Sequence, residues 1–326
     1  MEILVTGGAG FIGSNLTERL LKEGHEVVAL DNLDPYYDLR LKEVNLQRCR
    51  DITTDRFEFV EGSIKDEDLV DDIFADRSIE VVFHKAAKAG VRPSVEAPRE
   101  YNENNVTGLI NVLKTANDNG VERLINASSS SVYGIPEYLP YDEEHPNSPK
   151  SPYAVTKLAN EHYCNVFNDL YNISTINLRY FTVYGPRMRP NMAISNFVSR
   201  CLNGEPPVIY GDGEQTRDFT YIDDVVDANL ELLDSSDVDG ETMNIGSTDR
   251  ISIRELAEYV VEYTGSDIDV IYEEGKDADA RHTHADVSKA SECIGYDPNV
   301  NIREGVSAFI DWYRGNRNWY EPLVLE

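Results

Sequence analysis

Short apolar runs alternate with amphipathic stretches along the first half of the chain. Buried strands are predicted at 2–6, 26–30, 57–60, 80–83, 123–127 and 175–178. Helices are predicted between them at 11–23, 39–50, 67–75, 95–119 and 152–171. Strands and helices that alternate at this spacing form a parallel sheet covered by helices on both faces. Because crossover connections are right-handed, we predict an α/β fold with a doubly wound parallel sheet.

The regular alternation stops after about residue 180. Prolines and glycines then break the pattern into short pieces, and helical patterns return only at 224–233, 253–263 and 302–314. We therefore predict two units. Residues 1–180 form the sheet domain, and residues 181–326 form a smaller C-terminal lobe that packs on it.

The charge balance excludes several classes of partner. The chain has 59 acidic and 30 basic residues, for a net charge of −29. Such a protein repels nucleic acids and anionic lipid surfaces. The acids are spread along the whole chain, so we hypothesise adaptation to high salt, which screens carboxylate repulsion. The alternative is an ordinary acidic protein.

Hydropathy and cysteine usage predict a cytoplasmic location. No apolar run is long enough to span a membrane, and the first residues lack a basic segment followed by an apolar one. Four well-separated cysteines favour reduced thiols over a disulfide framework or a zinc site. His282 and His284 are interpreted as surface residues, so no metal is expected.

A glycine-rich turn follows the first predicted strand and opens the first predicted helix. Gly7 and Gly10 allow a tight turn that approaches a pyrophosphate, and Gly13 allows close packing of the helix on the sheet. The helix N-terminus offers free N–H groups and a positive dipole to phosphates. At this position in an alternating chain, the turn predicts a dinucleotide-binding (Rossmann) domain.

Asp31 ends the second predicted strand, 18 residues after Gly13. A carboxylate there accepts hydrogen bonds from the ribose hydroxyls of adenosine and repels a 2′-phosphate. No arginine follows it directly, so NAD is favoured over NADP as the cofactor.

Tyr153 and Lys157 lie four residues apart at the start of a predicted helix, which places both side chains on one face. An ammonium next to a phenol, together with a positive nicotinamide ring, is expected to lower the pKa of the tyrosine toward working pH. Ser129 ends the preceding predicted strand. This arrangement predicts Ser129, Tyr153 and Lys157 as the catalytic residues.

These motifs together resemble the extended short-chain dehydrogenases/reductases that act as NAD-dependent nucleotide-sugar epimerases and dehydratases. The resemblance covers nearly the whole chain. The matching segments are TGGAGFIG (6–13), DNL (31–33), FHKAAKAGVRPS (83–94), YNENNVTG (101–108), SSSSVYG (128–134), YAVTK (153–157), RYFTVYGP (179–186), TRDFTYIDDVV (216–226) and ADVSKA (285–290).

The resemblance implies a role for each matching residue. Tyr153 is the general base and acid, Ser129 contacts the sugar O4, and Lys157 binds the nicotinamide ribose. The implied cofactor contacts are Gly7, Gly10, Phe11, Ile12, Gly13, Asp31, Asn32, Ser63, Ile64, Ala86, Asn105, Tyr153, Lys157 and Tyr180. Ser63 departs from the family, which usually has Asp at this position beside the adenine.

The resemblance also implies a nucleotide-sugar substrate held by the second lobe. Arg217 matches an arginine that pairs with a substrate phosphate, which suits a bidentate guanidinium. Lys276 and Asp279 match a phosphate-binding and a ribose-binding position, although most of their segment differs from the family. The implied substrate contacts are Lys88, Ser129, Thr182, Arg189, Tyr210, Arg217, Lys276, Asp279 and Thr283.

Among the reactions of the family, a UDP-sugar 4-epimerase that works through a transient 4-keto sugar is expected. Dehydratases and decarboxylases carry an acid just after the catalytic serine or threonine, whereas Ser130 and Ser131 stand here. The segment from Thr182 to Arg189 resembles UDP-glucuronate 4-epimerases but is partly shared with neutral-sugar epimerases. UDP-glucuronate and UDP-glucose are favoured, and UDP-N-acetylglucosamine stays open.

Two further expectations follow from the family. The predicted helices at 95–119 and 152–171 resemble those that form a four-helix dimer interface, so a homodimer is expected. A protein that binds NAD without catalysis is the remaining alternative. It is disfavoured because the tyrosine and lysine of the catalytic pair are both present.

Overall fold

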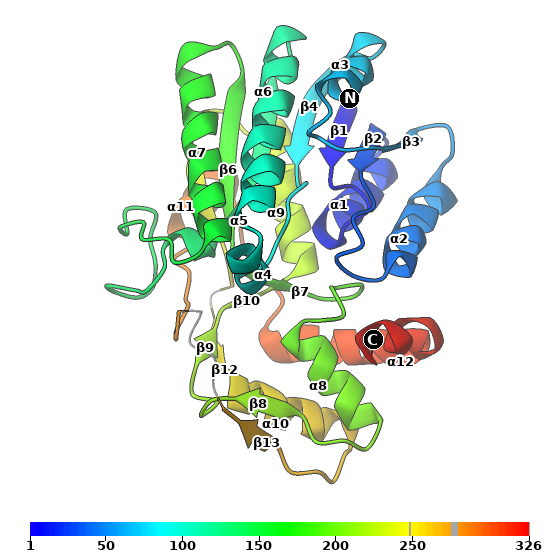
Figure 1. Ribbon diagram of the computed structural model, residues 1–326, viewed down its shortest axis with the longest axis vertical. Helices are drawn as coiled ribbons and strands as arrows, with labels where there is room; N and C mark the ends of the chain where they lie inside the picture. The colour runs from blue at the N-terminus through cyan, green and yellow to red at the C-terminus, as the bar shows by residue number, and fades with distance from the viewer. Residues whose placement is uncertain (248, 275–279, 326) are drawn as a thin grey trace.

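The computed structural model describes residues 1–247, 249–274 and 280–325, and a seven-stranded parallel sheet forms its larger part (Figure 1). The strand order is β11-β6-β5-β4-β1-β2-β3, and each pair of neighbours is parallel. The strands are β1 (Glu2–Thr6), β2 (Glu26–Asp31), β3 (Phe57–Glu61), β4 (Ile79–His84), β5 (Arg123–Ser129), β6 (Ser174–Tyr180) and β11 (Thr242–Ile245). This order confirms the predicted doubly wound sheet.

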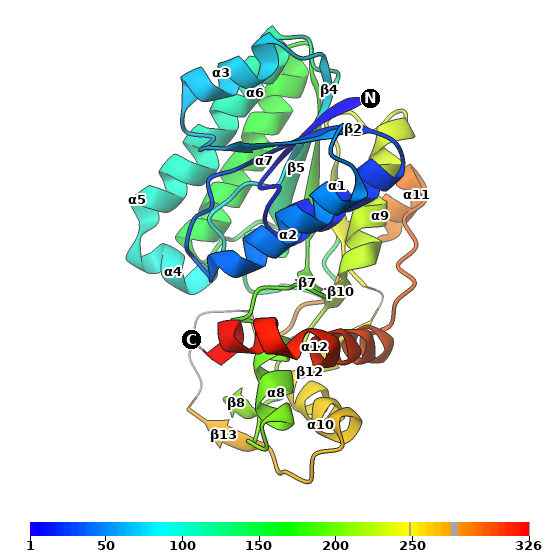
Figure 2. The same cartoon turned by 90° about the vertical axis from the view of Figure 1, so that its right-hand side faces the viewer.

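Helices cover both faces of this sheet (Figure 2). On one face, α1 (Phe11–Lys22) packs against α2 (Leu39–Ile52) and α9 (Ile222–Asp234). On the other face, α6 (Gly108–Asp118) packs against α3 (Glu67–Ala75) and α7 (Pro152–Leu170). The strand order reverses between β1 and β4, where β1 pairs with β2 on one side and β4 on the other. In open α/β sheets this switch point is where ligands bind.

The single helix predicted at 95–119 is wrong, because four shorter segments occupy this region. They are α4 (Val91–Glu96), α5 (Pro98–Tyr101), a π-helical turn (Asn102–Thr107) and α6. Pro98 lacks a backbone N–H, and Ala97 before it has φ −129° and ψ 53°, outside the helical region. The chain therefore starts a new helix at Pro98. A short 3-10 segment (Ser130–Val132) follows β5.

The second lobe is built from short strand pairs and helices. Parallel pairs join β7 (Thr182–Tyr184) to β10 (Phe219–Tyr221) and β8 (Val208–Tyr210) to β13 (Ile271–Glu273). An antiparallel pair joins β9 (Thr216–Arg217) to β12 (Ile251–Ser252). The helices are α8 (Ala193–Leu202), α10 (Ile253–Thr264) and α12 (Ile302–Leu325), while α11 (Ser288–Ile294) packs against β11 and α9. β11 belongs to the large sheet, and α9 packs against α1 on one face of that sheet. The large sheet and its covering helices therefore include residues from both sides of the boundary predicted at residue 180.

One hydrophobic core runs through both parts of the molecule. It begins at the strands and α1, includes Leu20 and Ile176, and continues into the second lobe through Phe197 and Phe309. The continuous core fixes the orientation of the lobes, so side chains from both can meet at one site. Within the described ranges, no helix is long and apolar enough to cross a membrane. All four cysteines are free thiols.

Candidate functional site

A cavity of about 740 Å³ opens at the carboxyl ends of the central strands, between the sheet and the second lobe. Residues that follow β1, β4, β5 and β6 line it, which is the position expected for a ligand in this fold. Most of the predicted site residues line this cavity. They are Gly7, Gly10, Phe11, Ile12, Gly13, Asp31, Asn32, Ser63, Ile64, Ala86, Lys88, Ser129, Tyr153, Lys157, Tyr180, Thr182, Arg189 and Arg217.

The glycine turn has the geometry of a phosphate cradle. Gly7 has φ +71°, and a Cβ there would lie 2.7 Å from the backbone nitrogen of Ala86. A Cβ on Gly13 would lie 2.2 Å from the carbonyl oxygen of Gly7. Gly10 caps α1 with no side-chain hydrogen bond, and the first turn of α1 holds no acidic residue. The N–H groups and dipole of this helix end thus face the cavity and suit a pyrophosphate.

Asp31 is held rigidly at the end of β2. Its carboxylate accepts hydrogen bonds from the backbone N–H groups of Ala9 (3.2 Å) and Leu33 (2.9 Å). It also forms a buried ion pair with Lys42, at 3.0 Å. Sequence reasoning missed Lys42, because it occupies an ordinary polar position on the α2 pattern. The expected repulsion of a 2′-phosphate is therefore partly offset by a neighbouring ammonium, which also lines the cavity.

The segment after β3, predicted to lie beside the adenine, forms part of the cavity wall. Ser63 lines the cavity with its hydroxyl 3.2 Å from the backbone N–H of Lys65. Ile64 is buried and packs so closely on α6 that a Cβ on Gly108 would lie 2.5 Å from its Cδ1. Ile64 thus offers an apolar wall.

Ser129, Tyr153 and Lys157 meet at the centre of the cavity, where β5 and α7 lie side by side. Pro152 begins α7, and Ser151 caps it by accepting the N–H of Ala154 at 3.2 Å. This cap fixes the first turn of the helix and therefore the position of Tyr153. The Ser129 hydroxyl donates to the Ser131 hydroxyl and accepts the backbone N–H of Ser131, both at 3.2 Å, so its predicted contact with the sugar O4 stays a prediction.

The pKa of Tyr153 is set by burial and by two neighbouring side chains. Burial raises the pKa of Tyr153, while its hydrogen bond with Ser129 and the guanidinium of Arg189 act in the opposite direction. The Lys157 ammonium instead donates to the carbonyl oxygen of Ala127 at 2.5 Å. The effect predicted for Lys157 acting together with a positive nicotinamide ring stays a prediction. Burial also lowers the pKa of Lys157 to about 8.

A second lysine that lines the cavity, Lys85, is half-buried and was missed by sequence reasoning. Its ammonium nitrogen is 2.9 Å from the Tyr180 hydroxyl, which donates to Asn229 at 3.0 Å. Burial and the nearby charge of Lys157 hold the pKa of Lys85 well below its usual range. The signal that could have found it is a lysine directly after a buried strand, in the motif that also contains Lys88.

Asn105, predicted to contact the cofactor, lies behind the cavity wall. It is fully buried, and its amide nitrogen donates to the Lys88 carbonyl and the Thr156 hydroxyl, both at 3.0 Å. Its amide oxygen accepts the Lys88 N–H at 2.8 Å. Asn105 thus joins the segment after β4 to α7 by hydrogen bonds. The Lys88 ammonium forms an ion pair with Glu100 at 2.7 Å on the cavity rim.

The predicted substrate contacts of the second lobe are only partly brought together. Thr182, Arg189 and Arg217 line the cavity, and the Arg217 guanidinium is oriented by the carbonyl oxygens of Thr216 and Arg281. Tyr210 and Thr283 do not line it. The Thr283 hydroxyl accepts the backbone N–H of Asp218 at 3.2 Å. Lys276 and Asp279 lie outside the described residues.

No group of three or more potential metal ligands occurs among the described residues. His282, predicted to be a surface residue, is hydrogen-bonded through its ring Nδ1 with the Thr216 hydroxyl at 3.0 Å.

The sequence matches the model of the NAD dependent epimerase/dehydratase family over residues 3–246. The UDP-glucuronate 4-epimerase of Thermodesulfobacterium geofontis is 38% identical over 314 residues, which cover 96% of each chain. The crystal structure of UDP-glucuronic acid 4-epimerase from Bacillus cereus, in complex with UDP-glucuronic acid and NAD, superposes with a TM-score of 0.91. That protein is 36% identical, and the match covers 97% of this chain and all of the other.

UDP-glucose 4-epimerase of Thermotoga maritima, solved with UDP-glucose, is also similar. Its TM-score is 0.89 at 34% identity, with 97% of this chain and 100% of the other covered.

Proposed function

The chain belongs to the NAD dependent epimerase/dehydratase family, and on this premise we propose that it is an NAD-dependent UDP-sugar 4-epimerase. The observation that carries the proposal is the meeting of Ser129, Tyr153 and Lys157 in the cavity that the glycine turn opens into. One cavity thus combines a proton-transfer group with a dinucleotide cradle, as oxidation and reduction of a sugar carbon require.

The residues present fit NAD along the whole cavity. The free N–H groups of α1 suit the pyrophosphate, Asp31 suits the adenosine ribose, and the wall formed by Ile64 suits the adenine. Lys157 and Tyr180 also line the cavity and suit the nicotinamide and its ribose. When bound, NAD supplies the hydride acceptor and donor that the reaction at C4 needs.

Tyr153 takes the proton from the sugar O4 and later returns it, while Ser129 holds the same oxygen by a hydrogen bond. Arg217 retains the diphosphate, so the transient 4-keto sugar can turn within the cavity without leaving. The charge of the Arg189 guanidinium partly opposes the burial that raises the pKa of Tyr153, and so favours the phenolate needed for the first step. The protein thus orients the sugar, moves one proton and excludes water.

We propose UDP-glucuronate as the preferred substrate, with UDP-glucose as the second candidate. Thr182 and Arg189 both line the cavity, and a guanidinium there suits a sugar carboxylate. Dehydration or decarboxylation is disfavoured, because Ser130 and Ser131 occupy the cavity wall just after Ser129, where those reactions use an acid.

Product analysis tests the proposal. The purified protein is incubated separately with UDP-glucuronate, UDP-glucose and UDP-N-acetylglucosamine, and the sugars are separated by chromatography. We expect the 4-epimer of UDP-glucuronate at the highest rate, and no product from a Tyr153→Phe variant. Conversion of none of the three, or formation of a 4-keto-6-deoxy sugar or a pentose, would contradict it.

We also propose a homodimer formed through α7 and its neighbour α4. Val155, Val166 and Leu170 are exposed apolar residues of α7, and helical geometry places them on one side. Val95 of α4 is exposed as well. Apolar surface on one helical face is typical of a protein interface. A Val166→Glu variant is expected to halve the mass measured by light scattering, and an unchanged mass would exclude this interface.

A cytoplasmic location and adaptation to high salt complete the proposal. Free cysteines fit a reducing compartment.

A net charge of −29 makes the carboxylates of the folded protein repel one another at low ionic strength. Urea unfolding in a salt series is expected to show stability that rises with salt concentration. Stability that is independent of salt would identify an ordinary acidic protein instead.

A further inference from the structure

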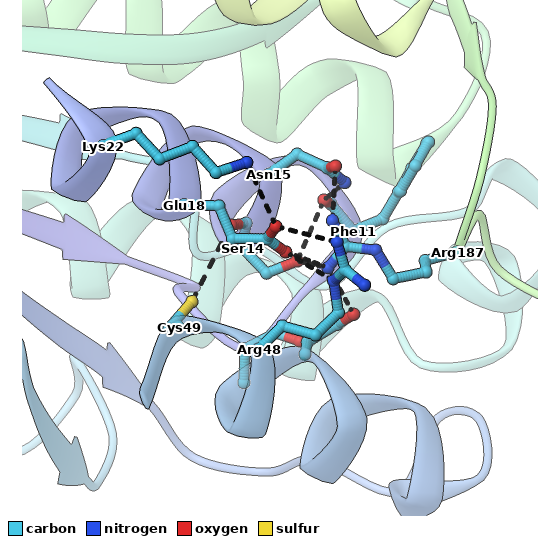
Figure 3. Close-up of polar contacts among 10 residues, drawn as sticks. Phe11, Ser14, Asn15, Glu18, Lys22, Arg48, Cys49 and Arg187 are labelled. Atoms are coloured by element: carbon cyan, nitrogen blue, oxygen red, sulfur yellow. Dashed lines mark hydrogen bonds and ion pairs between the residues drawn. The ribbon is translucent and has the colours of Figure 1, made fainter. Parts of the chain in front are cut away.

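A buried arginine joins the second lobe to the dinucleotide-binding helix. Arg187 lies in the loop between β7 and α8, yet only 4% of its surface is exposed. Its guanidinium pairs with Glu18 of α1 at 2.6 Å, and the carboxylate is equally buried (Figure 3). The loop of one lobe is therefore attached to a helix of the other by a charge pair that excludes water.

Neutral partners complete the surroundings of this guanidinium. It donates to the side-chain oxygens of Asn15 (2.6 Å) and Asn45 (3.0 Å), and more weakly to the Ser14 hydroxyl (3.5 Å). Figure 3 shows Ser14, Asn15 and Glu18 on α1, gathered around Arg187. A planar guanidinium with several fixed acceptors has one orientation, which a lysine ammonium does not reproduce.

The backbone of Arg187 is strained. Its φ is +67°, in the left-handed region that a residue with a side chain seldom adopts. Such strain persists only where surrounding contacts determine the conformation, and it clusters near functional sites. The bonds of the Arg187 side chain to α1 and α2 are those contacts. Without them, the loop is free to relax away from the strained conformation.

The strained residue lies two positions before Arg189, which lines the same cavity as Tyr153. Between them, Met188 is fully buried, and its carbonyl oxygen accepts the Tyr320 hydroxyl at 2.7 Å. After it, the Arg189 carbonyl accepts the N–H of Met192 at 3.3 Å. Arg187 is thus the anchor that joins the Arg189 segment to the sheet domain, while Tyr320 joins it to α12.

We propose that Arg187 is a positioning residue: its bonds to Glu18, Asn15 and Asn45 hold the loop 185–192 so that Arg189 faces the substrate. Arg187 is bound to Glu18 and Asn15 of α1, the same helix whose N-terminus forms the phosphate cradle. The phosphate cradle and the loop that carries Arg189 are therefore both attached to α1. The part that concerns the sugar carboxylate rests on the proposed function.

Three substitutions test this role. Arg187→Lys keeps the positive charge but loses the planar guanidinium with its several donors, and Arg187→Met removes both the charge and the guanidinium. Glu18→Gln changes the partner on α1 and leaves the loop sequence unchanged. Arg48→Lys is the matched control, because Arg48 contacts the same carboxylate at 3.1 Å but belongs to α2 and not to the loop. Two readouts are used: steady-state kinetics with UDP-glucuronate, and hydrogen exchange of the backbone amides of residues 185–192.

For Arg187→Lys and Arg187→Met we expect KM to rise about tenfold and kcat to fall by a smaller factor, because Arg189 no longer faces the substrate or favours the Tyr153 phenolate, while Tyr153 itself remains in place. Amide exchange in 185–192 is expected to accelerate about tenfold or more. Glu18→Gln should raise KM and accelerate amide exchange by smaller factors than the Arg187 variants, since an amide oxygen still accepts a hydrogen bond from Arg187. Arg48→Lys should match the wild type in both.

Unchanged exchange in 185–192 together with an unchanged KM in Arg187→Lys would overturn the proposal, and so would equal effects in Arg48→Lys. If Arg187→Met does not fold, Arg187→Lys and Glu18→Gln carry the test. If the wild type leaves UDP-glucuronate unconverted and converts another UDP-sugar, the proposed substrate fails. Exchange in 185–192 and KM for that other sugar then decide the role of Arg187 independently.

Discussion

Gly13→Ala is the substitution that tests the phosphate cradle most specifically. The new Cβ would lie 2.2 Å from the Gly7 carbonyl oxygen and 3.1 Å from the Cα of Gly8. Carbon and oxygen atoms do not approach so closely, so α1 and the turn must separate by roughly 1 Å. A hydrogen bond from a backbone N–H to a charged phosphate contributes about 1.5–3 kcal/mol. Loss of one such bond corresponds to roughly 10- to 100-fold weaker NAD binding.

Stability responds to two opposing effects. Alanine is favoured over glycine within a helix by about 0.5–1 kcal/mol, whereas overpacking costs about 1–3 kcal/mol. Gly315 in the exposed part of α12 is the matched control, because a Cβ there meets nothing within 4 Å. Gly315→Ala should therefore gain stability, and Gly13→Ala should be less stable than Gly315→Ala by about 1–3 kcal/mol.

Urea unfolding and calorimetric titration with NAD measure the two quantities separately. If Gly13→Ala binds NAD as tightly as the wild type and is as stable as Gly315→Ala, the reasoning from the glycine turn is refuted.

Three further outcomes are expected. Burial lowers the pKa of His84 to about 3, so this histidine stays neutral when folded but binds a proton when unfolded below pH 6.5. Wild-type stability should fall by about 2 kcal/mol between pH 6.5 and 5, and His84→Asn should lack that loss while keeping the wild-type slope between pH 7 and 8. Lys42→Met leaves Asp31 buried and unpaired, so urea unfolding should show a loss of about 3–5 kcal/mol; less than 1 kcal/mol would contradict the pair. Arg217→Met should weaken UDP binding about tenfold or more in calorimetry, and unchanged affinity would remove Arg217 from the diphosphate site.

Six of the seven strands of the sheet could be predicted because each contains a short run rich in apolar residues at regular spacing between helical patterns. β1 was predicted with its observed bounds, and each of the other five predicted strands differs from the observed strand by at most two residues at either end. The glycine turn and the Tyr153–Lys157 pair could be predicted as well, because both motifs are local in sequence. The two- and three-residue strands of the second lobe carry no such periodicity. β11 is only four residues long and was missed for the same reason.

Contacts between distant segments could not be predicted from the sequence. The Asp31–Lys42 pair and the Arg187–Glu18 pair depend on how α2 and the loop 185–192 pack on the sheet domain. The environment of Tyr153 is a similar case. Helical spacing correctly placed Lys157 on the same helix, but it could not show that the ammonium contacts the Ala127 carbonyl.

The central claim is that Tyr153 moves the O4 proton while the sugar lies against a nicotinamide cofactor. The most direct measurement mixes UDP-glucuronate with the purified protein and follows the near-ultraviolet absorbance of the reduced nicotinamide in a stopped-flow instrument. We predict a small transient reduction that decays as the 4-epimer forms, and its loss in Tyr153→Phe with UDP affinity unchanged. A Tyr153→Phe protein that gives the wild-type transient and turnover would contradict the account.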